Sequence, residues 1–555
     1  MGALIRTGTS LLGAYLLASG TLRLWPESGM VRPFMVLWVL QFFSSLAWSI
    51  VFYPKFFSPL RHLPGPRDGS FFMGQFADIR RYPTGVPQIK WANSIPNDGI
   101  IRYLSLFNME RLLITSPKAL AEVLTTKNYE FQKPSNVRFN LGRLLGVGLL
   151  LAEGDEHKAQ RRKLLPAFGF RHVKNLYPIF WSKSRECVEA MTKEVQLEAG
   201  KNPAADGKAT AVMEVGSWAS RVTLDIIGVT GLGRDFGAIA NPSNELNQTY
   251  QKVFKPTRQA QILGILQLIL PARLLDLLPV KRNHDVHSAA HIIRATCADL
   301  IREKRQRQAL KEPTDLDILS VALESGYFSD ENLVDQLMTF LAAGHETTAS
   351  AMTWAVYLLA RHPEMQTRLR AEVRERLPSI SEADGGKTIS SFDIDNMPYL
   401  NAVCNEVLRY YSPVPLTLRE AAVDTTIQGQ FIPKGTHVML SPWAVNKSES
   451  LWGPDAREFN PDRWIPKFEG DKNAASGGAA SNYAFMTFLH GPRSCIGQAF
   501  AKGEFACLVA AWVGRFGFEL HDKSLVDETK IQIKGGITAR PSNGMFIKVT
   551  VLDGW

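Results

Sequence analysis

The stretch of sequence that decides the interpretation of this chain is a loop near its carboxyl end, Phe488-Leu489-His490-Gly491-Pro492-Arg493-Ser494-Cys495-Ile496-Gly497. It places a single cysteine among glycine and proline residues, and the residues that follow, 498–516, have the apolar pattern of a helix. The Cys495 sulfur would therefore lie near the positive end of a helix dipole, which favours the thiolate. Such a sulfur is either a nucleophile or a metal ligand.

These two roles of Cys495 require different neighbours. A nucleophile needs a positioned base, and His490 is the local candidate. Zinc and iron–sulfur clusters need further Cys or His ligands, which the surrounding sequence does not provide. A prosthetic heme needs one proximal thiolate. Gly491 and Gly497 would let the backbone approach its flat ring, and Arg493 would pair with a propionate.

The composition is that of an ordinary globular protein with a large core. The 555 residues are 45% hydrophobic and 21% charged, and 63 Lys and Arg against 53 Asp and Glu give a net charge of +10. The basic residues are scattered, so we expect no nucleic-acid partner. The five cysteines are widely spaced and contain no Cys-x-x-Cys pair, so they encode neither a disulfide framework nor a zinc knuckle.

Residues 1–54 predict a membrane anchor. Its main span, 33–54, is uncharged and rich in Phe, Leu, Val and Trp, and is long enough to cross a hydrocarbon core of ~30 Å as a helix. A second uncharged stretch, 7–22, is a first span, an interfacial helix or a signal-like segment. More basic residues follow the main span than precede it, which places the rest of the chain in the cytosol.

After the anchor, residues 55–70 predict a stiff Pro/Gly hinge, because Leu63-Pro64-Gly65-Pro66 cannot continue a helix. Residues 71–555 then predict one mainly α domain with small β-sheets. Strand-like segments occur at 99–115, 425–440 and 531–551, and the middle one has the turns of a short hairpin.

The longest helical pattern begins near Ser329 or Asp330, ends near Arg361, and has polar residues in its middle. There the sequence reads Ala342-Ala343-Gly344-His345-Glu346-Thr347-Thr348 inside an otherwise apolar core helix. A hydroxyl at Thr347 can bond the carbonyl four residues back, and a local opening at Gly344 would leave room for a ligand or water beside Glu346. A Ser/Thr-rich turn that faces solvent is the alternative.

A second helical pattern, 398–411, contains Glu406-Val407-Leu408-Arg409, an acid and a base three residues apart on one helical face. By itself this spacing is weak support for any function, because most such pairs are solvated surface ion pairs.

The spacing Phe-x-x-Gly-x-Arg-x-Cys-x-Gly resembles the heme-binding loop of the cytochrome P-450 superfamily of heme-thiolate monooxygenases. The fixed positions of this motif are occupied here by Phe488, Gly491, Arg493, Cys495 and Gly497. The other motifs follow in the family's order, so the resemblance covers essentially the whole chain after the anchor. It implies the P-450 fold, a single α-rich heme domain, with Cys495 as the axial thiolate of heme b.

The same resemblance implies roles for residues outside the loop. Glu346 and Thr347 match the oxygen-activation turn of the long distal helix and would relay protons to O2. Glu406 and Arg409 match a helix pair that joins Arg463, from Phe459-Asn460-Pro461-Asp462-Arg463-Trp464, in a buried structural ion network.

Three further residues are implied to hold the heme propionates. In the segment 154–162, His157 stands where the family more often has Trp, and Arg161 follows four residues later. A solvated basic helix face is the alternative for this segment. Arg419 approaches a propionate or lies at the surface.

The resemblance implies a monooxygenase that inserts one oxygen atom from O2 into a lipophilic small molecule, by hydroxylation or epoxidation. The sequence has no flavin or nicotinamide fingerprint, so electrons would come from a separate NADPH-dependent cytochrome reductase, a flavoprotein. A microsomal-type enzyme would lie in the endoplasmic reticulum membrane, facing the cytosol. The alternatives are a heme-thiolate isomerase or dehydratase, a heme protein without turnover, and a thiol hydrolase that uses Cys495 and His490.

Overall fold

The computed structural model describes residues 11–13, 15–16, 19–20, 31–201, 207–255, 257–267, 270–310, 317–380, 388–533 and 538–555. The uncharged segment 7–22 falls largely outside these residues, so its nature stays a prediction.

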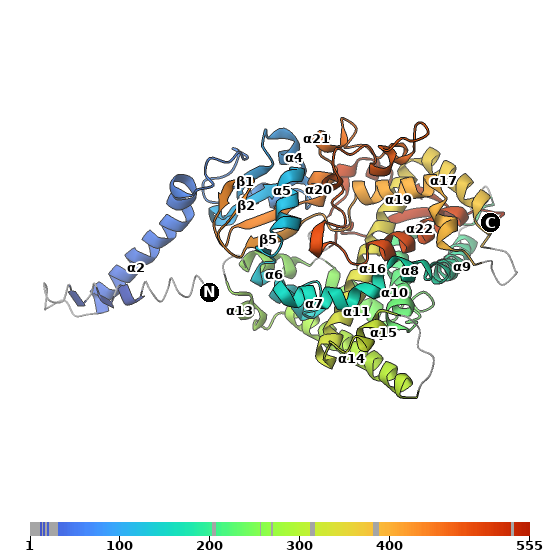
Figure 1. Ribbon diagram of the computed structural model, residues 1–555, viewed down its shortest axis with the longest axis horizontal. Helices are drawn as coiled ribbons and strands as arrows, with labels where there is room; N and C mark the ends of the chain where they lie inside the picture. Colours follow the sequence, from blue (N-terminus) through green and yellow to red (C-terminus); the bar gives the residue numbers. More distant parts are fainter. Residues whose placement is uncertain are drawn as a thin grey trace.

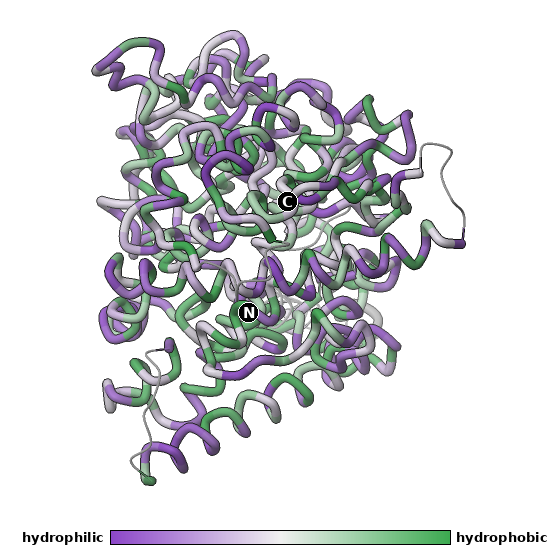
Figure 2. The backbone as a smooth tube through the Cα atoms, turned by 90° about the vertical axis from the view of Figure 1, so that its right-hand side faces the viewer, coloured by the Kyte–Doolittle hydropathy of each residue, from purple (hydrophilic) through white to green (hydrophobic). Residues whose placement is uncertain are grey.

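The body is mainly helical with small sheets, as predicted (Figure 1). The α-helices are α2 (Val31–Ala47), α3 (Phe76–Arg81), α4 (Val86–Ser94), α5 (Pro117–Ala121), α6 (Ser135–Leu145), α7 (Gly154–Leu164), α8 (Phe170–Lys174), α9 (Tyr177–Lys201), α10 (Val215–Ile227), α11 (Glu245–Phe254), α12 (Arg258–Leu266), α13 (Ala272–Asp276), α14 (Lys281–Ala309), α15 (Ile318–Glu324), α16 (Asp330–Arg361), α17 (Pro363–Arg376), α18 (Ser391–Asp395), α19 (Pro398–Tyr410), α20 (Pro442–Asn446), α21 (Glu449–Trp452) and α22 (Gln498–Arg515). Along the peripheral helices, hydrophobic and hydrophilic residues alternate (Figure 2). Such a pattern is typical of helices with one face on the core and the other in solvent.

The strands are β1 (Ile100–Leu104), β2 (Glu110–Ile114), β3 (Phe131–Gln132), β4 (Thr210–Glu214), β5 (Thr417–Ala421), β6 (Thr425–Ile427), β7 (Gln430–Ile432), β8 (His437–Leu440), β9 (Phe516–Leu520) and β10 (Phe546–Val551). They form sheets with the orders β1-β2-β8-β5-β3, β4-β10-β9 and β6-β7. Among the strands described here, all pairs are antiparallel except β2 with β8, where Ile114 pairs with Leu440.

The three strand predictions have different outcomes. The 99–115 segment is the β1–β2 hairpin, and the 425–440 segment supplies the β6–β7 hairpin and then β8, which joins the five-stranded sheet. Of the 531–551 segment, the described part forms β10 and an isolated bridge between Ile533 and Pro541. The proline-containing sequence before β10 does not support a longer strand.

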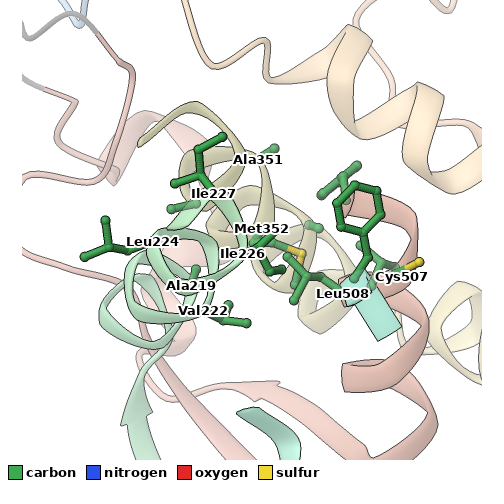
Figure 3. Close-up of a cluster of buried hydrophobic side chains, with 14 of the residues drawn as sticks. Ala219, Val222, Leu224, Ile226, Ile227, Ala351, Met352, Cys507 and Leu508 are labelled. Atoms are coloured by element: carbon green, nitrogen blue, oxygen red, sulfur yellow. The ribbon is translucent and has the colours of Figure 1, made fainter. Parts of the chain in front are cut away.

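Helix α16 crosses the body and contacts α10, α19 and α22 (Figure 1). It begins where predicted, because the Ser329 side chain accepts a hydrogen bond from the Asn332 N–H, and it ends at Arg361. Apolar side chains of α10, α16 and α22 meet in the core around Ile226, Met352 and Leu508 (Figure 3). Burying each such side chain contributes about 1.5–3 kcal/mol, which is why these three helices hold their positions.

The predicted anchor is helical over its whole main span. Helix α2 continues without interruption into a π-helix, η2 (Trp48–Phe57), and together they form one apolar helix, Phe34–Phe57, that projects from the body (Figure 1). Its length and composition would allow it to cross a membrane. The helix ends at Phe57, three residues after its predicted end at Pro54, and non-helical chain begins at Ser58.

Candidate functional site

The Cys495 loop is held by its own backbone and lies directly before α22. The Cys495 N–H donates to the Phe488 carbonyl at 2.8 Å, which closes the loop around the short helix Gly491–Arg493. The sulfur accepts a hydrogen bond from the Gly497 N–H. The Cys495 side chain is exposed, whereas the other four cysteines are buried.

The electrostatic environment of Cys495 has two opposing parts. Burial of the thiol by the surrounding protein raises its pKa, while the Gly497 N–H and the Arg161 guanidinium lower it. The Cys495 residue is thus exposed to solvent although protein surrounds its thiol. This arrangement suits a ligand atom that meets a bound group inside the protein.

The two glycines of the loop have different surroundings. Gly491 has φ +74°, and a Cβ at this position would lie 2.1 Å from the Leu124 carbonyl oxygen. Glycine is therefore required there for the loop to pack on the π-helix Glu122–Thr126, a reason that the sequence did not reveal. Around Gly497, the nearest neighbour of an added Cβ is a Phe168 ring carbon at 3.7 Å, so protein packing alone would tolerate a side chain.

Cations from several elements gather beside the loop. Arg161 on α7 donates to the Ser494 carbonyl at 2.8 Å and to the Ser494 hydroxyl at 3.3 Å. His157 lies one turn earlier on α7, and its Nδ1 is 3.2 Å from the Tyr129 hydroxyl. Arg419 on β5 is buried, as is Arg493 of the loop itself. The structure therefore brings together the four basic residues that the sequence implied.

The charges of this cluster repel one another. Burial, followed by the positive charges of Arg493 and Arg161, lowers the pKa of His157 to about 4. Burial and Arg493 lower the pKa of Arg419 to about 10. Lys133, which sequence reasoning missed, belongs to the same cluster, because burial and Arg419 bring its pKa well below the ordinary value.

In the described ranges, the carboxylate of Glu153 opposes these cations. Glu153 forms an ion pair with Nη2 of Arg493 and accepts the backbone N–H of Lys133 at 3.0 Å. Nε and Nη1 of Arg493 are buried without a hydrogen-bond partner among the residues that the structure describes. Unpaired buried guanidinium donors are costly, so an anionic ligand would complete the cluster. A heme fits, because its propionates supply carboxylates and its iron needs one thiolate.

The middle of α16 presents a narrow accessible face. Most residues from Leu333 to Leu359 are buried, whereas Ala343 is exposed and Thr347 is half-buried. These two residues lie one turn apart, and the Thr347 hydroxyl donates to the Ala343 carbonyl at 2.8 Å, as the sequence predicted. Gly344 has a packing reason, because an added Cβ would lie 2.9 Å from Cγ1 of Ile227 on α10.

Glu346 faces away from this accessible surface and is 2% exposed. Its Oε2 lies 3.0 Å from Nη2 of Arg540, which also donates to the Glu346 carbonyl, and its Oε1 lies 3.6 Å from Nε2 of His345. Burial alone would raise the pKa of Glu346, but Arg540 and His345 lower it below the ordinary value. The helix is continuous here, so an ion pair occupies the carboxylate where the sequence suggested a local opening.

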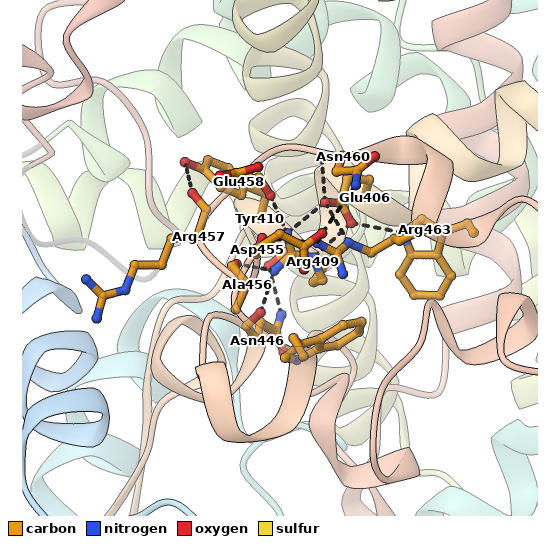
Figure 4. Close-up of polar contacts among 12 residues, drawn as sticks. Glu406, Arg409, Tyr410, Asn446, Asp455, Ala456, Arg457, Glu458, Asn460 and Arg463 are labelled. Carbon is orange, nitrogen blue, oxygen red and sulfur yellow. Dashed lines mark hydrogen bonds and ion pairs between the residues drawn. The ribbon is translucent and has the colours of Figure 1, made fainter.

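Glu406, Arg409 and Arg463 meet in a buried network (Figure 4). Arg409 donates from Nε and Nη2 to Glu406 at 2.8 and 2.7 Å, and its remaining N–H groups bond backbone carbonyls, namely those of Asn446, Ala456 and Glu458. Glu406 also accepts from Arg463 at 3.2 Å, from the Asn460 N–H and from the Trp464 indole.

This network is connected to the Cys495 loop through Asn446. The Asn446 amide donates to the Arg409 carbonyl and to the Thr487 hydroxyl, and its oxygen accepts the Met486 N–H at 2.7 Å. Met486 and Thr487 directly precede Phe488, the first residue of the loop. The network therefore fixes the position at which the loop begins.

These features together are characteristic of a heme-thiolate protein. The body is rich in α-helix, and an accessible thiol lies directly before a helix. A cation cluster would suit a ligand that carries carboxylates, and a threonine lies on the accessible face of the core helix. Comparisons with known proteins agree. The chain belongs to the cytochrome P450 family, because the family model "Cytochrome P450" matches residues 66–547.

Curated relatives match over nearly the whole chain. It is 47% identical to the cytochrome P450 monooxygenase sphH of Aspergillus fumigatus, over 92% of each chain. It is 44% identical to the cytochrome P450 monooxygenases ALT8 of Alternaria alternata, over 92% of each chain, and FUM15 of Gibberella moniliformis, over 93% of this chain and 91% of the relative. The protein is therefore a heme monooxygenase with cysteine thiolate ligation that uses O2, a redox partner reductase and a small-molecule substrate. The isomerase, carrier and thiol-hydrolase alternatives are not favoured.

Proposed function

We propose that Cys495 is the axial thiolate of heme b and that Phe488, Gly491, Arg493, Gly497, His157, Arg161 and Arg419 form the cofactor site. The observation that carries this proposal is the pair of unpartnered nitrogens of buried Arg493, in a cluster where cations outnumber carboxylates, beside the accessible sulfur. When bound, the heme supplies the chemistry of O2 activation.

The protein groups of this site have separate tasks. The Gly497 N–H bonds the Cys495 sulfur and stabilises its negative charge. Arg493, Arg161 and Arg419 hold the propionates by charge-assisted hydrogen bonds. His157, neutral at pH 7 because its pKa is about 4, donates one ring N–H. Glu406, Arg409 and Arg463 keep the loop in place without contacting the cofactor.

Thr347 and Glu346 serve proton delivery in this proposal. The Thr347 hydroxyl lies on the accessible face of α16, and rotation away from the Ala343 carbonyl presents its proton to that face. Glu346, which is held by Arg540, is the neighbouring carboxylate; to return a proton to the hydroxyl it would first leave Arg540 and take up a proton itself. The substrate is a lipophilic small molecule that undergoes hydroxylation or epoxidation.

The cellular setting completes the proposal. The apolar helix Phe34–Phe57 anchors the enzyme in the endoplasmic reticulum membrane, with the catalytic domain, 71–555, facing the cytosol. An NADPH-dependent cytochrome reductase, a flavoprotein, supplies the electrons. Exposed basic residues of α7, Lys158, Arg162 and Lys163, favour docking of an acidic partner surface.

The first experiment is the carbon-monoxide difference spectrum of the reduced protein. A strongly red-shifted Soret band is expected for the wild type and for Cys507→Ala, which removes a buried cysteine from α22. Cys495→Ala should lose this band. Retention of the thiolate spectrum in Cys495→Ala would exclude Cys495 as the ligand.

A second experiment tests the role of Thr347. Thr353 is a matched control on the same helix, because its hydroxyl donates to the Ala349 carbonyl at 2.8 Å, as Thr347 does to Ala343. Thr347→Ala should consume O2 with a smaller yield of product, whereas Thr353→Ala should keep the wild-type ratio. Equal ratios in all three proteins would remove Thr347 from proton delivery.

A further inference from the structure

Three segments meet where the apolar helix leaves the body: the π-helix η2 (Trp48–Phe57), the loop 70–74, and the turn between β1 and β2. Asn108 of that turn joins all three. Its side-chain amide donates to the Ile50 carbonyl and to the Phe71 carbonyl, each at 2.8 Å, and the residue is fully buried.

The hairpin holds the last turn of the helix by further contacts. Arg102 on β1 donates to the Pro54 carbonyl and pairs with Glu110 on β2 at 2.7 Å. The Ser58 hydroxyl, directly after the helix, donates to Glu110 at 2.6 Å. Arg102 and Glu110 are both largely buried. The end of the helix is therefore bound to the sheet by side chains that solvent scarcely reaches.

The backbone of the turn between β1 and β2 is strained where Asn108 makes these contacts. Phe107 and Asn108 have φ of +55° and +52°, so two consecutive non-glycine residues are left-handed. Asn accepts this conformation better than most residues. Gly74, at φ +51°, lies so close to β1 that a Cβ would be 2.3 Å from the Leu104 carbonyl oxygen. The loop 70–74 is thus pressed onto the strand that also holds the helix.

These contacts leave four apolar side chains at the surface beside the helix. Phe71 and Phe72 are each 57% exposed, Met73 is 38% exposed and Phe107 is 37% exposed. We call these residues the aromatic tip. The Lys55 ammonium lies 3.4 Å from the centre of the Phe71 ring. Aromatic rings beside a cation are typical of the boundary between the hydrocarbon core and the lipid headgroups.

We propose that the aromatic tip inserts into the bilayer surface, and that Asn108 locks it to the end of the membrane helix. The helix and the catalytic domain would then meet the membrane as one rigid unit, without swivelling about a linker. The inference rests on the proposed membrane anchoring. We assign the bilayer as the partner of the aromatic tip because the tip adjoins an apolar helix. The apolar surface of that helix is removed from water only by lipid or by another apolar surface.

The test measures the depth of a nitroxide label in the full-length, heme-loaded protein on phosphatidylcholine and phosphatidylserine vesicles. The label is attached to a cysteine introduced by Phe72→Cys. The natural cysteines should not compete for the label, because four are buried and Cys495 belongs to the cofactor site. Phe392→Cys is the matched control, since Phe392 is 72% exposed on α18. The label at 72 should collide preferentially with dissolved O2, and the label at 392 with an aqueous nickel chelate.

Two further variants test the lock. Asn108→Gly removes the amide without straining a left-handed backbone, and Asn108→Asp keeps the size but places a carboxylate against two carbonyl oxygens. In either background the label at 72 should lose its preference for O2. An unchanged reduced carbon-monoxide spectrum shows that the domain is folded.

Four outcomes would overturn the proposal, each in a recognisable way. A label at 72 that meets water on vesicle-bound protein excludes insertion but leaves the anchor intact. A protein that does not bind vesicles refutes the membrane anchoring itself, and this inference with it. A label shielded from both reagents until the protein is diluted to one chain per vesicle means that a second copy covers the tip. Asn108 variants that keep the label in lipid exclude the lock.

Discussion

Two buried ionic clusters lie near the Cys495 loop, and they differ in whether the protein satisfies them. In the cluster of Glu406, Arg409 and Arg463, every N–H of the Arg409 side chain has a protein acceptor, and the arginine and the glutamate are fully buried. In the cluster around Arg493, two guanidinium nitrogens have no partner within the described part of the chain, and Glu153 is the carboxylate that faces the surrounding cations. The first cluster is closed by the protein alone, whereas the second requires a ligand.

The difference gives a physical criterion for separating structural from cofactor-binding charges. Leaving a buried charged donor unsatisfied costs free energy, and mutually repelling cations add to this cost. A protein keeps such a cluster when a ligand compensates it. The lowered pKa of His157, Arg419 and Lys133 therefore indicates an anion site, while the complete hydrogen bonding around Arg409 indicates scaffolding.

The largest effect is expected from breaking the closed cluster. Arg409→Leu leaves Glu406 as a buried carboxylate with fewer partners, and should lower the free energy of unfolding by about 3–5 kcal/mol. Urea unfolding of the heme-free chain, followed by circular dichroism, measures this. Arg493→Leu in the same assay should cost clearly less, because Arg419 and Lys133 still offset the charge of Glu153 and the mutual repulsion of the cations is relieved. Equal destabilisation by both variants would erase the distinction between the clusters.

A pH series tests the cluster around Arg493, which the protein alone does not satisfy, through the titration of His157. Its pKa falls from 6.5 to about 4 on folding of the heme-free chain, so the unfolded chain binds a proton between these values that the folded chain does not. The stability contribution is complete above pH 6.5 and is lost as the pH falls towards 4. At about 1.4 kcal/mol per pKa unit, the loss is up to about 3 kcal/mol.

The measurement is urea unfolding at several pH values, with His157→Gln as the control that should flatten the curve in this window. Heme-loaded protein should show a shallower dependence, because the propionates offset the cations that lower the pKa of His157. Identical slopes with and without heme would mean that no anion reaches this cluster.

Retention of heme gives a smaller effect. Arg493→Gln removes charge-assisted hydrogen bonds and should weaken heme binding by about 2 kcal/mol, which corresponds to a roughly thirtyfold faster loss of heme. Transfer of heme to excess heme-free myoglobin follows this directly. Lys158→Gln, on the exposed side of α7, should lose heme at the wild-type rate. An unchanged rate in Arg493→Gln would place Arg493 outside the propionate site.

The sequence predicts those parts of the two clusters that short motifs encode. Glu406 and Arg409 lie three residues apart on one helix, and Arg493 and Cys495 share one loop, so spacing alone brings them together. The limits of α16 were likewise predictable, because Ser329 is a good helix cap and Pro363 cannot continue a helix. These features depend on local geometry.

Contacts between distant segments could not be predicted in this way. Arg540 meets Glu346 across 194 residues, and Lys133 and Glu153 reach Arg493 from other elements. A lone arginine or lysine in a loop gives no sign of its partner, since only the packed fold determines which side chains meet. The requirement for glycine at position 491 also comes from tertiary packing, because a Cβ there would clash with the carbonyl oxygen of Leu124.

The smallest change in the free energy of unfolding is expected just outside the cluster of Glu406, Arg409 and Arg463. An ion pair there separates the effect of the distance between two charges from the effect of their burial. Arg368 and Asp462 form an ion pair at 2.7 Å, the same distance as between Arg409 and Glu406, but their side chains are 51% and 60% exposed. Asp462→Asn removes this charge and leaves the Arg368 guanidinium on the Tyr399 ring. Because water already solvates both partners, the free energy of unfolding should change by less than about 1 kcal/mol. If Asp462→Asn lowered the free energy of unfolding as much as Arg409→Leu does, the short distance between the charges would determine the stability of the motif around Arg463. Burial would then not distinguish the cluster of Glu406, Arg409 and Arg463 from an ion pair at the protein surface.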